Sequence, residues 1–395
     1  MLAAVVAASV AASLGGACGD VSSDPGDADA NDGGASDAGA IDAATDARAD
    51  GGSDADTTGD ADARDADASP PPFEPWDPSG DAADVRSDRL CAESAAPDDA
   101  ADTVQIDCRL EGANLAPGDV APTDAIVVMT WNIERGVHLD AQLAALREDP
   151  ALPVPDILLA SELDRGCSRS GYRDVAREYA EALGMNYVFA VEFIELPRPG
   201  GPGGTIETMC EHGNAIFSRY PLGNVEVLRH DDNRDWYVPP EDRGDDGEPR
   251  LGGRIDVAAD VRIGDEILHV VSVHYESNPF FENDQVNQAN ATAERAAAQP
   301  WPVVVGGDTN NGTYFVDLQQ GTRTDATVEA FFGRGFEDPH VGLPWDQRGT
   351  RGGLVIDLLF GLGVTTTNPG ICPADLCDPL SDHRAVWATV SPTER

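Results

Sequence analysis

The chain has 395 residues, with 71 acidic and 26 basic side chains and a formal net charge of −45. Every basic residue is an arginine, and the absence of lysine excludes a Walker lysine, a Schiff-base lysine and a lysine general base. No segment carries the run of Lys and Arg that counterion release requires, which argues against a polybasic binder of nucleic acid or of anionic membranes.

Residues 1–18 match the apolar part of an export signal, and their apolar run is shorter than the about 20 residues that span a bilayer. Small residues precede Cys18, and Gly19 and Asp20 follow it, as in a bacterial lipoprotein cleavage box in which Cys18 would carry the lipid. Leu14 lies four residues before Cys18, where such boxes have three, so an ordinary secretory signal stays as the alternative. Either interpretation predicts an exported protein, on the cell surface or secreted.

Residues 19–72 consist mainly of Asp, Ala, Gly, Ser and Thr, and no aromatic residue occurs among them. Such a segment buries too little apolar surface to offset its ordering entropy, and its like charges extend it further. We therefore expect a disordered acidic stalk. Residues 73–121 show no clear periodicity, and we interpret them as an N-terminal extension of the domain that follows.

The chain contains seven cysteines, and six remain when Cys18 is set aside. Proximity favours the pairs Cys91–Cys108 and Cys372–Cys377, which leaves Cys167–Cys210 as a long bridge. Three disulfides would fit an oxidising compartment. A zinc site is disfavoured, because no two cysteines have the C-x-x-C spacing.

Residues 122–395 form the predicted catalytic domain, in which apolar strands alternate with amphipathic helices. We predict strands at 125–133, 156–163, 186–196, 213–218, 224–229, 254–262, 266–275, 302–307, 354–360 and 384–390. We predict helices at 139–148, 172–183, 283–298 and 325–333. Strands outnumber helices, and hairpins mix with crossovers. This favours two packed sheets covered by helices over a doubly wound parallel sheet.

Polar side chains cluster at the ends of the predicted strands, and seven short motifs carry them. In chain order these motifs are WNIE (131–134), SELD (161–164), GNAIFSRYPL (213–222), VSVHYES (271–277), GGDTNN (306–311), IDLLF (356–360) and SDH (381–383). In this order the motifs resemble the endonuclease/exonuclease/phosphatase superfamily, also called the deoxyribonuclease-I-like fold. The resemblance implies an α/β fold, a four-layer α-β-β-α sandwich of two packed mixed sheets, here preceded by the acidic stalk.

The resemblance also implies a divalent metal held by Glu162, Glu134 and Asp382, with the substrate-binding Asn132 beside Glu162. Carboxylate and amide oxygens suit Mg²⁺, and also Mn²⁺ or Ca²⁺, better than zinc. Such an ion neutralises a phosphate group and helps to make a nucleophile of water. The sequence therefore predicts a magnesium site that is built from oxygen ligands.

Five residues carry the catalytic roles that the resemblance implies. Asp308 would orient or deprotonate the attacking water, and Asn310 would hold a phosphate oxygen. His383 would polarise the phosphate or transfer a proton, with Asp357 as its orienting carboxylate, and His274 would donate to the phosphoryl oxygen or the leaving group. A His beside a buried Asp has a fixed tautomer and a more basic ring, which suits this chemistry.

The substrate implied is a phosphoester: nucleic acid, a lipid headgroup or a small phosphodiester. Arg219 is a further candidate for phosphate binding, and the loops at 197–204, 229–253 and 277–283 would set specificity. The leading hypothesis is an exported, divalent-metal-dependent hydrolase of phosphate esters, in particular a phosphodiesterase. The alternatives are an extracellular nuclease and a surface-tethered, non-catalytic binding module. No protein partner is evident, and the only membrane contact expected is a lipid on Cys18.

Overall fold

The structure is a computed structural model that describes residues 70–78, 110–118, 120–200, 203–233, 248–277, 282–311 and 325–393. All of these belong to one compact unit, residues 67–395. The predicted export signal, most of the predicted stalk and the cysteines Cys18, Cys91 and Cys108 lie outside the described residues. Within the described part of the chain, no helix is both long and apolar enough to cross a membrane.

The larger of two sheets has eight strands in the order β1-β4-β5-β3-β2-β13-β12, with β7 paired to β4. Its strands are β1 (Glu111–Ala113), β2 (Ile126–Arg135), β3 (Ile157–Arg165), β4 (Asn186–Glu195), β5 (Cys210–Ser218), β7 (Arg250–Gly252), β12 (Val364–Ile371) and β13 (Val386–Pro392). Strands β2 and β3 run parallel, and their other neighbours are antiparallel, so the sheet is mixed.

The smaller sheet has five strands in the order β11-β10-β9-β8-β6. They are β6 (Leu222–Arg229), β8 (Ile255–Ile263), β9 (Glu266–His274), β10 (Val303–Asp308) and β11 (Asp357–Leu362). Here β9 and β10 are the parallel pair, and the other pairs are antiparallel. Each sheet therefore has a central parallel pair whose strands end on the same side.

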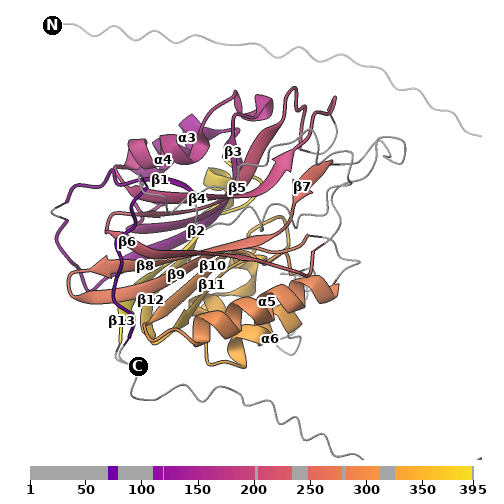
Figure 1. Ribbon diagram of the computed structural model, residues 1–395. Coiled ribbons are helices and arrows are strands. Elements are labelled where there is room, and N and C mark those ends of the chain that lie inside the picture. The colour runs from indigo at the N-terminus through magenta and orange to yellow at the C-terminus, as the bar shows by residue number, and fades with distance from the viewer. Residues whose placement is uncertain are drawn as a thin grey trace, which may run out of the picture. The chain divides into compact units, whose positions relative to one another are not determined.

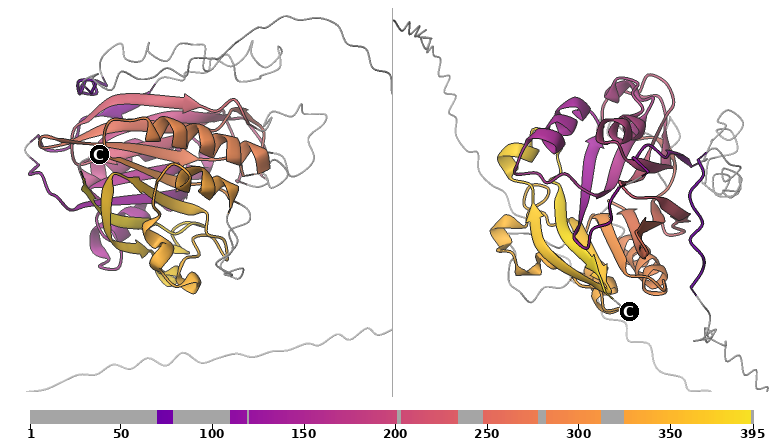
Figure 2. Two further views of the ribbon diagram at one scale, coloured as in Figure 1. Left: turned by 90° about the horizontal axis from the view of Figure 1, so that it is seen from below. Right: turned by 90° about the vertical axis from the view of Figure 1, so that its left-hand side faces the viewer.

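Helices cover the outer face of each sheet (Figures 1 and 2). The larger sheet carries α3 (Leu139–Glu148) and α4 (Val175–Leu183), and the smaller sheet carries α5 (Glu282–Ala297) and α6 (Ala326–Phe332). Short helical turns fill several connections: α7 (Ala374–Cys377), η2 (Ser168–Ser170), η4 (Pro339–Gly342) and η5 (Trp345–Gln347). The layers are thus helix, sheet, sheet and helix, which confirms the predicted fold class.

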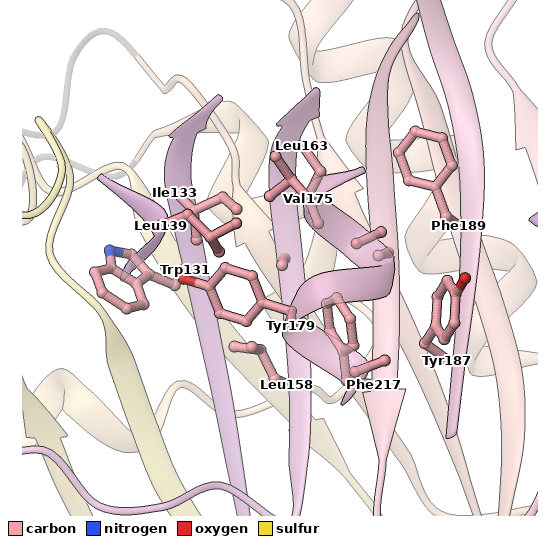
Figure 3. Close-up of a cluster of buried hydrophobic side chains, with 14 of the residues drawn as sticks. Trp131, Ile133, Leu139, Leu158, Leu163, Val175, Tyr179, Tyr187, Phe189 and Phe217 are labelled. Atoms are coloured by element: carbon pink, nitrogen blue, oxygen red, sulfur yellow. The ribbon is translucent and has the colours of Figure 1, made fainter. Parts of the chain in front are cut away.

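Successive side chains of a strand point to opposite faces of the larger sheet, so its apolar residues form one core layer against the smaller sheet and another against the helices. Residues of β2 show the pattern, because Ile126 and Val128 face the smaller sheet while Met129 and Trp131 face the helices. Tyr179 of α4 packs beside Phe217 of β5 in the helix-facing layer (Figure 3), with ring centroids 5.8 Å apart. Two packed layers of apolar side chains hold the larger sheet rigid between its helices and its partner sheet, and rigid strands position the polar side chains at their ends.

The predicted elements agree with the structure at most positions. Helix α3 has the predicted bounds, and α4 begins later than predicted because Asp174 caps it, its side chain accepting a hydrogen bond from the Arg177 N–H. The predicted disulfides Cys167–Cys210 and Cys372–Cys377 are both present. The predicted pair Cys91–Cys108 lies outside the described residues.

The sequence did not predict strands β1, β7 and β12. The first two are only three residues long, and β12 contains Pro369 and Gly370, which weaken any strand signal. Strand β12 lies at an edge of the larger sheet, where proline is tolerated, and its pairing with β13 shifts register between Thr367 and Gly370.

Candidate active site

The polar residues at the strand ends gather at one end of the sandwich. Asp308, the last residue of β10, pairs in register with His274 at the end of β9 and with Asp357 at the start of β11. Asn132 lies near the end of β2 in the facing sheet, and its side-chain amide donates to Asp308 Oδ2 at 3.1 Å. The two sheets thus meet through polar contacts at this end.

Asp308 lies between two imidazoles. Its Oδ2 atom is 3.7 Å from His383 Nε2 and 3.8 Å from His274 Nε2. The other nitrogen of His383, Nδ1, lies 2.8 Å from Asp357 Oδ2. All four side chains are buried, so these charges interact in a low-dielectric environment and influence one another strongly.

The electrostatics of this group favour a charged histidine. Burial alone would lower the pKa of His383, but the carboxylates of Asp357 and Asp308 outweigh it and raise the pKa to about 10. Burial raises the pKa of Asp308, with a further contribution from Asp357, while His383 acts against it. At neutral pH the site therefore holds a cationic His383 that can donate hydrogen bonds to an anion.

His274 has its own set of partners. Its Nδ1 atom lies 3.1 Å from Glu192 Oε2, and Arg254 Nη1 lies within 2.9 Å of both ring nitrogens. Arg254 also donates to Glu192 Oε1 at 2.6 Å. Burial would raise the pKa of Glu192, but His274 and Arg254 lower it to about 2, so this carboxylate is ionised at any ordinary pH.

Glu162 and Asn132 form the oxygen-rich side of the site. The Asn132 amide donates to Glu162 Oε1 at 3.1 Å as well as to Asp308, and its Oδ1 accepts from the Glu134 N–H. Glu162 and Glu134 have φ values of 57° and 47°, in the left-handed region that non-glycine residues rarely adopt. Strained backbone at both acidic residues fits a functional site.

The carboxylate of Glu162 is suited to bind a cation. Burial would raise its pKa, but Arg135 and the nearby histidines His212, His274 and His383 bring it well below the usual value. Its Oε2 atom is buried and has no hydrogen-bond partner, and the charge of Arg135, 3.6 Å away, compensates it without a hydrogen bond, so this oxygen is left to accept an ion or a ligand. The residues present therefore fit a hard divalent cation at Glu162.

Glu134 and Asp382 lie together at the rim of the site. The Asp382 N–H donates to Glu134 Oε2 at 3.1 Å, and the Asp382 carboxylate contacts Arg351 at 2.8 Å. Burial raises the pKa of Glu134, and the charge of Asp382 raises it further. Two acidic side chains so close together favour a cation between them or beside them.

Asp308, Asp357 and His383 also have ligand atoms within 4.8 Å of one another, close enough to hold a metal ion. His383 would offer an imidazole nitrogen to such an ion, whereas Mg²⁺ prefers oxygen ligands. Oxygen ligands around Glu162 therefore suit Mg²⁺ better than this group does, and the group is better suited to proton transfer.

Asn310 lies at the edge of the group around Asp308 and Glu162, and Arg219 lies outside it. Asn310 follows Asp308 with φ 47°, and its side-chain amide donates to the Tyr275 carbonyl, so it lies at the edge of the site. Arg219 instead pairs with Asp156 at 2.7 Å, at the start of β3, whereas Glu162 lies near the end of that strand. The structure does not bring Arg219 to the group of candidate site residues.

A network of buried ion pairs joins β3, β4 and β5 of the larger sheet. Arg169 contacts Asp164 at 2.7 Å and Glu195 at 3.0 Å, and Arg250 reaches the same oxygen of Glu195 at 2.9 Å. His212 Nδ1 lies 2.9 Å from Asp164 Oδ1. These charges compensate one another inside the larger sheet, and the loss of one partner would leave another buried and uncompensated.

Sequence reasoning missed several residues that contact the site or act on it electrostatically, namely Arg135, Glu192, His212, Arg254, Thr350 and Arg351. Glu192 gave a usable signal, because it is a charged residue inside the otherwise apolar run of β4. Thr350 gave none, since its Oγ1 accepts from the N–H groups of Ile356 and Asp357 across a loop.

Comparisons with known proteins agree with this architecture. A family model described as the Endonuclease/Exonuclease/phosphatase family matches residues 129–383. The fold is similar to that of an endonuclease/exonuclease/phosphatase from Beutenbergia cavernae DSM 12333, with 20% identity, a TM-score of 0.50 and coverage of 68% of this chain and 72% of that chain. No curated protein matches this chain.

Two further solved structures are more distant. The human Nocturnin catalytic domain with bound sulfate anion shares 16% identity, with a TM-score of 0.44 and coverage of 71% of this chain and 97% of that chain. A family protein from Leptotrichia buccalis C-1013-b shares 13% identity, with a TM-score of 0.46 and coverage of 68% and 100%.

Proposed function

The chain belongs to the Endonuclease/Exonuclease/phosphatase family, whose members are in general hydrolases of phosphate esters, and we propose that this protein is a divalent-metal-dependent phosphodiesterase. The observation that carries the proposal is the position of Asp308. Its carboxylate faces the imidazoles of His274 and His383 and accepts a hydrogen bond from Asn132. A carboxylate in this setting can orient a water molecule and take its proton while the imidazoles face the phosphate.

Each residue has a role that follows from its contacts. Asp308 orients the attacking water and accepts its proton. His383, charged and held by Asp357, donates to a phosphoryl oxygen on which negative charge accumulates. His274, whose ring nitrogens contact Glu192 and Arg254, lies beside Asp308 and is the candidate partner of the leaving oxygen.

Glu162 would hold the divalent cation, with Asn132, Glu134 and Asp382 near it. When bound, Mg²⁺, or Mn²⁺ or Ca²⁺ in its place, supplies positive charge that neutralises the phosphate and lowers the pKa of a bound water. The Oε2 atom of Glu162, which is buried without a hydrogen-bond partner, supports this assignment.

The substrate we favour is a small or weakly charged phosphodiester. From residue 121 onward the chain has 44 acidic and 21 basic residues, a net charge of −23, which disfavours long polyanions. An extracellular nuclease on the same site is the second candidate. Export, with or without a lipid on Cys18, belongs to the proposal, and the two disulfides support an oxidising compartment.

The test is hydrolysis of a chromogenic phosphodiester by the purified full chain with Mg²⁺ or Mn²⁺, and with EDTA as the metal-free control. Plasmid DNA, RNA and sphingomyelin distinguish the substrate classes. Asp308→Asn and His383→Ala should each lower turnover by about 10² or more. Asp260→Asn, which changes a similar buried pair with His269, is the matched control. No turnover of any substrate with either metal would favour a non-catalytic binding module.

A further inference from the structure

Two carboxylates of the candidate metal site, those of Glu162 and Asp382, are each paired with an arginine. Arg135 Nη1 lies 3.6 Å from Glu162 Oε2, and Arg351 Nη2 lies 2.8 Å from Asp382 Oδ2. Arg351 also interacts electrostatically with Asp308 and Glu162, so its charge acts on the site and not only on Asp382. These two guanidinium groups therefore pair with carboxylate oxygens of Glu162 and Asp382 that a divalent cation would also need.

Arg135 is held by charge rather than by hydrogen bonds to its carboxylate neighbours. Its Nη2 atom lies 3.9 Å from Glu248 Oε1, so the guanidinium lies between two carboxylates at distances longer than a hydrogen bond. Arg135 Nε, Glu162 Oε2 and Glu248 Oε1 are all buried and have no hydrogen-bond partner. Buried donors and acceptors without hydrogen-bond partners are expected to gain such partners when a ligand binds.

A divalent ion on Glu162 would repel the neighbouring guanidinium, because both are positive and the site is poorly hydrated. Glu248, which Arg198 and Arg250 also contact, offers Arg135 a second carboxylate. The planar guanidinium, once freed from Glu162, has N–H groups in the geometry that binds a phosphate oxygen.

We propose that Arg135, assisted by Arg351, is the counter-cation of the metal-free site and becomes a phosphate ligand when the metal binds. This inference rests on the proposed function. Arg135 would give the lysine-free, acidic domain a positive charge for its anionic substrate. Its move from Glu162 to the phosphate would couple the binding of metal and phosphate. Removal of Arg135 should therefore tighten metal binding and weaken phosphate binding.

The experiment measures Mn²⁺ affinity of the full chain from the electron paramagnetic resonance signal of free Mn²⁺, without substrate. Arg135→Gln should bind Mn²⁺ about fivefold more tightly than the wild type, and Arg351→Gln should show a smaller gain because its side chain is more exposed. With Mn²⁺ saturating, the affinity of Arg135→Gln for inorganic phosphate should fall about tenfold. Arg177→Gln, which removes an exposed pair with Glu181, should change neither affinity.

A second variant separates charge from packing. Arg135→Lys keeps the positive charge without the planar fork, so its Mn²⁺ affinity should stay near the wild-type value while its phosphate affinity falls. Unchanged or weaker Mn²⁺ binding in Arg135→Gln, with the fold intact by circular dichroism, would overturn the inference. Absence of Mn²⁺ binding in the wild type would instead contradict the proposed function itself.

Discussion

The Nδ1 atom of His383 lies 2.8 Å from Oδ2 of Asp357, and both residues are fixed by further contacts. The Asp357 N–H donates to Thr350 Oγ1, and the His383 carbonyl accepts from Trp131 Nε1 at 3.0 Å. One ring nitrogen of His383 is therefore engaged by a buried carboxylate, and the other is directed toward Asp308. This arrangement fixes the orientation of the imidazole and stabilises its protonated form.

Replacement of Asp357 by Asn should lower kcat by about 10² or more, because the amide keeps the shape of the carboxylate but not its charge. His383 would then lose the main source of its raised pKa, and the basic limb of the pH–rate profile should move to lower pH. The measurement is kcat against pH for this variant and for the control Asp260→Asn. In the wild type, Asp260 contacts His269 at 2.8 Å, the same distance as in the Asp357–His383 pair, but outside the candidate site. Equal loss of kcat in both variants would contradict a catalytic role for Asp357.

Close contact between β9 and β10 positions the site. Gly307 pairs with Val273, and a Cβ atom at Gly307 would meet the Val273 carbonyl oxygen at 1.9 Å. The next pair in the register is Asp308 and His274. Gly307→Ala should therefore force the strands apart, destabilise the protein by about 3 kcal/mol and lower turnover by displacing both side chains.

The control for this prediction is Gly342→Ala, since a Cβ at Gly342 meets no atom within 4 Å. Urea unfolding and turnover are measured on both variants. A Gly307→Ala protein with wild-type stability and activity would show that the close approach of the strands is not required.

The position of the candidate site was predictable because the motifs fall at strand ends. Asn132 and Asp308 follow runs of apolar residues that could be recognised as strands, and each lies in the parallel pair of its own sheet, whose strand ends fall at one edge. The order of the motifs then predicted the four-layer fold, and the fold brought Asn132 and Asp308 into contact.

The residues that the sequence did not reveal act through contacts that depend on register and loops. Arg254 immediately precedes β8, and only the pairing of β8 with β9 brings it to His274. Arg219 was predicted to lie in the site but does not. It follows β5, which runs antiparallel to β3, so it lies beside Asp156 at the start of β3, whereas Glu162 lies near the end of that strand. A single residue in a motif does not specify which end of a strand it occupies.

The two disulfides should differ in what they contribute. Cys167–Cys210 joins residues 43 apart, and its removal should cost about 4 kcal/mol of stability, whereas Cys372–Cys377, with a separation of 5, should cost about 2 kcal/mol. The shorter bridge precedes Ser381, whose N–H donates to the Cys377 carbonyl and whose hydroxyl donates to the Asn132 carbonyl. Its loss should loosen the segment that carries Asp382 and His383, so it should lower turnover more.

Urea unfolding and turnover of Cys372→Ala/Cys377→Ala and Cys167→Ala/Cys210→Ala test this difference, each protein serving as the control for the other. A larger loss of turnover in the variant without Cys167–Cys210, measured where both proteins are folded, would contradict the proposed role of the short bridge.

Buried carboxylates should make the protein sensitive to acid. The folded-state pKa values of Glu162, Asp164, Glu192 and Glu195 are all lowered, since arginine and histidine neighbours outweigh the effect of burial. A group whose pKa is lower in the folded state stabilises the fold above its unfolded pKa, and this contribution is lost as the pH falls through the folded value. The free energy of unfolding should thus fall between about pH 5 and pH 2.

Glu192 gives this prediction a magnitude and a test. Its pKa falls from 4.5 to about 2 on folding, which corresponds to roughly 3 kcal/mol of stability at neutral pH. Asp308 and Glu134, whose pKa values are raised, act in the opposite sense and offset part of the loss. Urea unfolding in EDTA at a series of pH values should show a shallower acid limb for Glu192→Gln than for the wild type. Glu181→Gln, at an exposed position, should keep the wild-type limb, and a wild-type stability that stays constant down to pH 3 would refute the prediction.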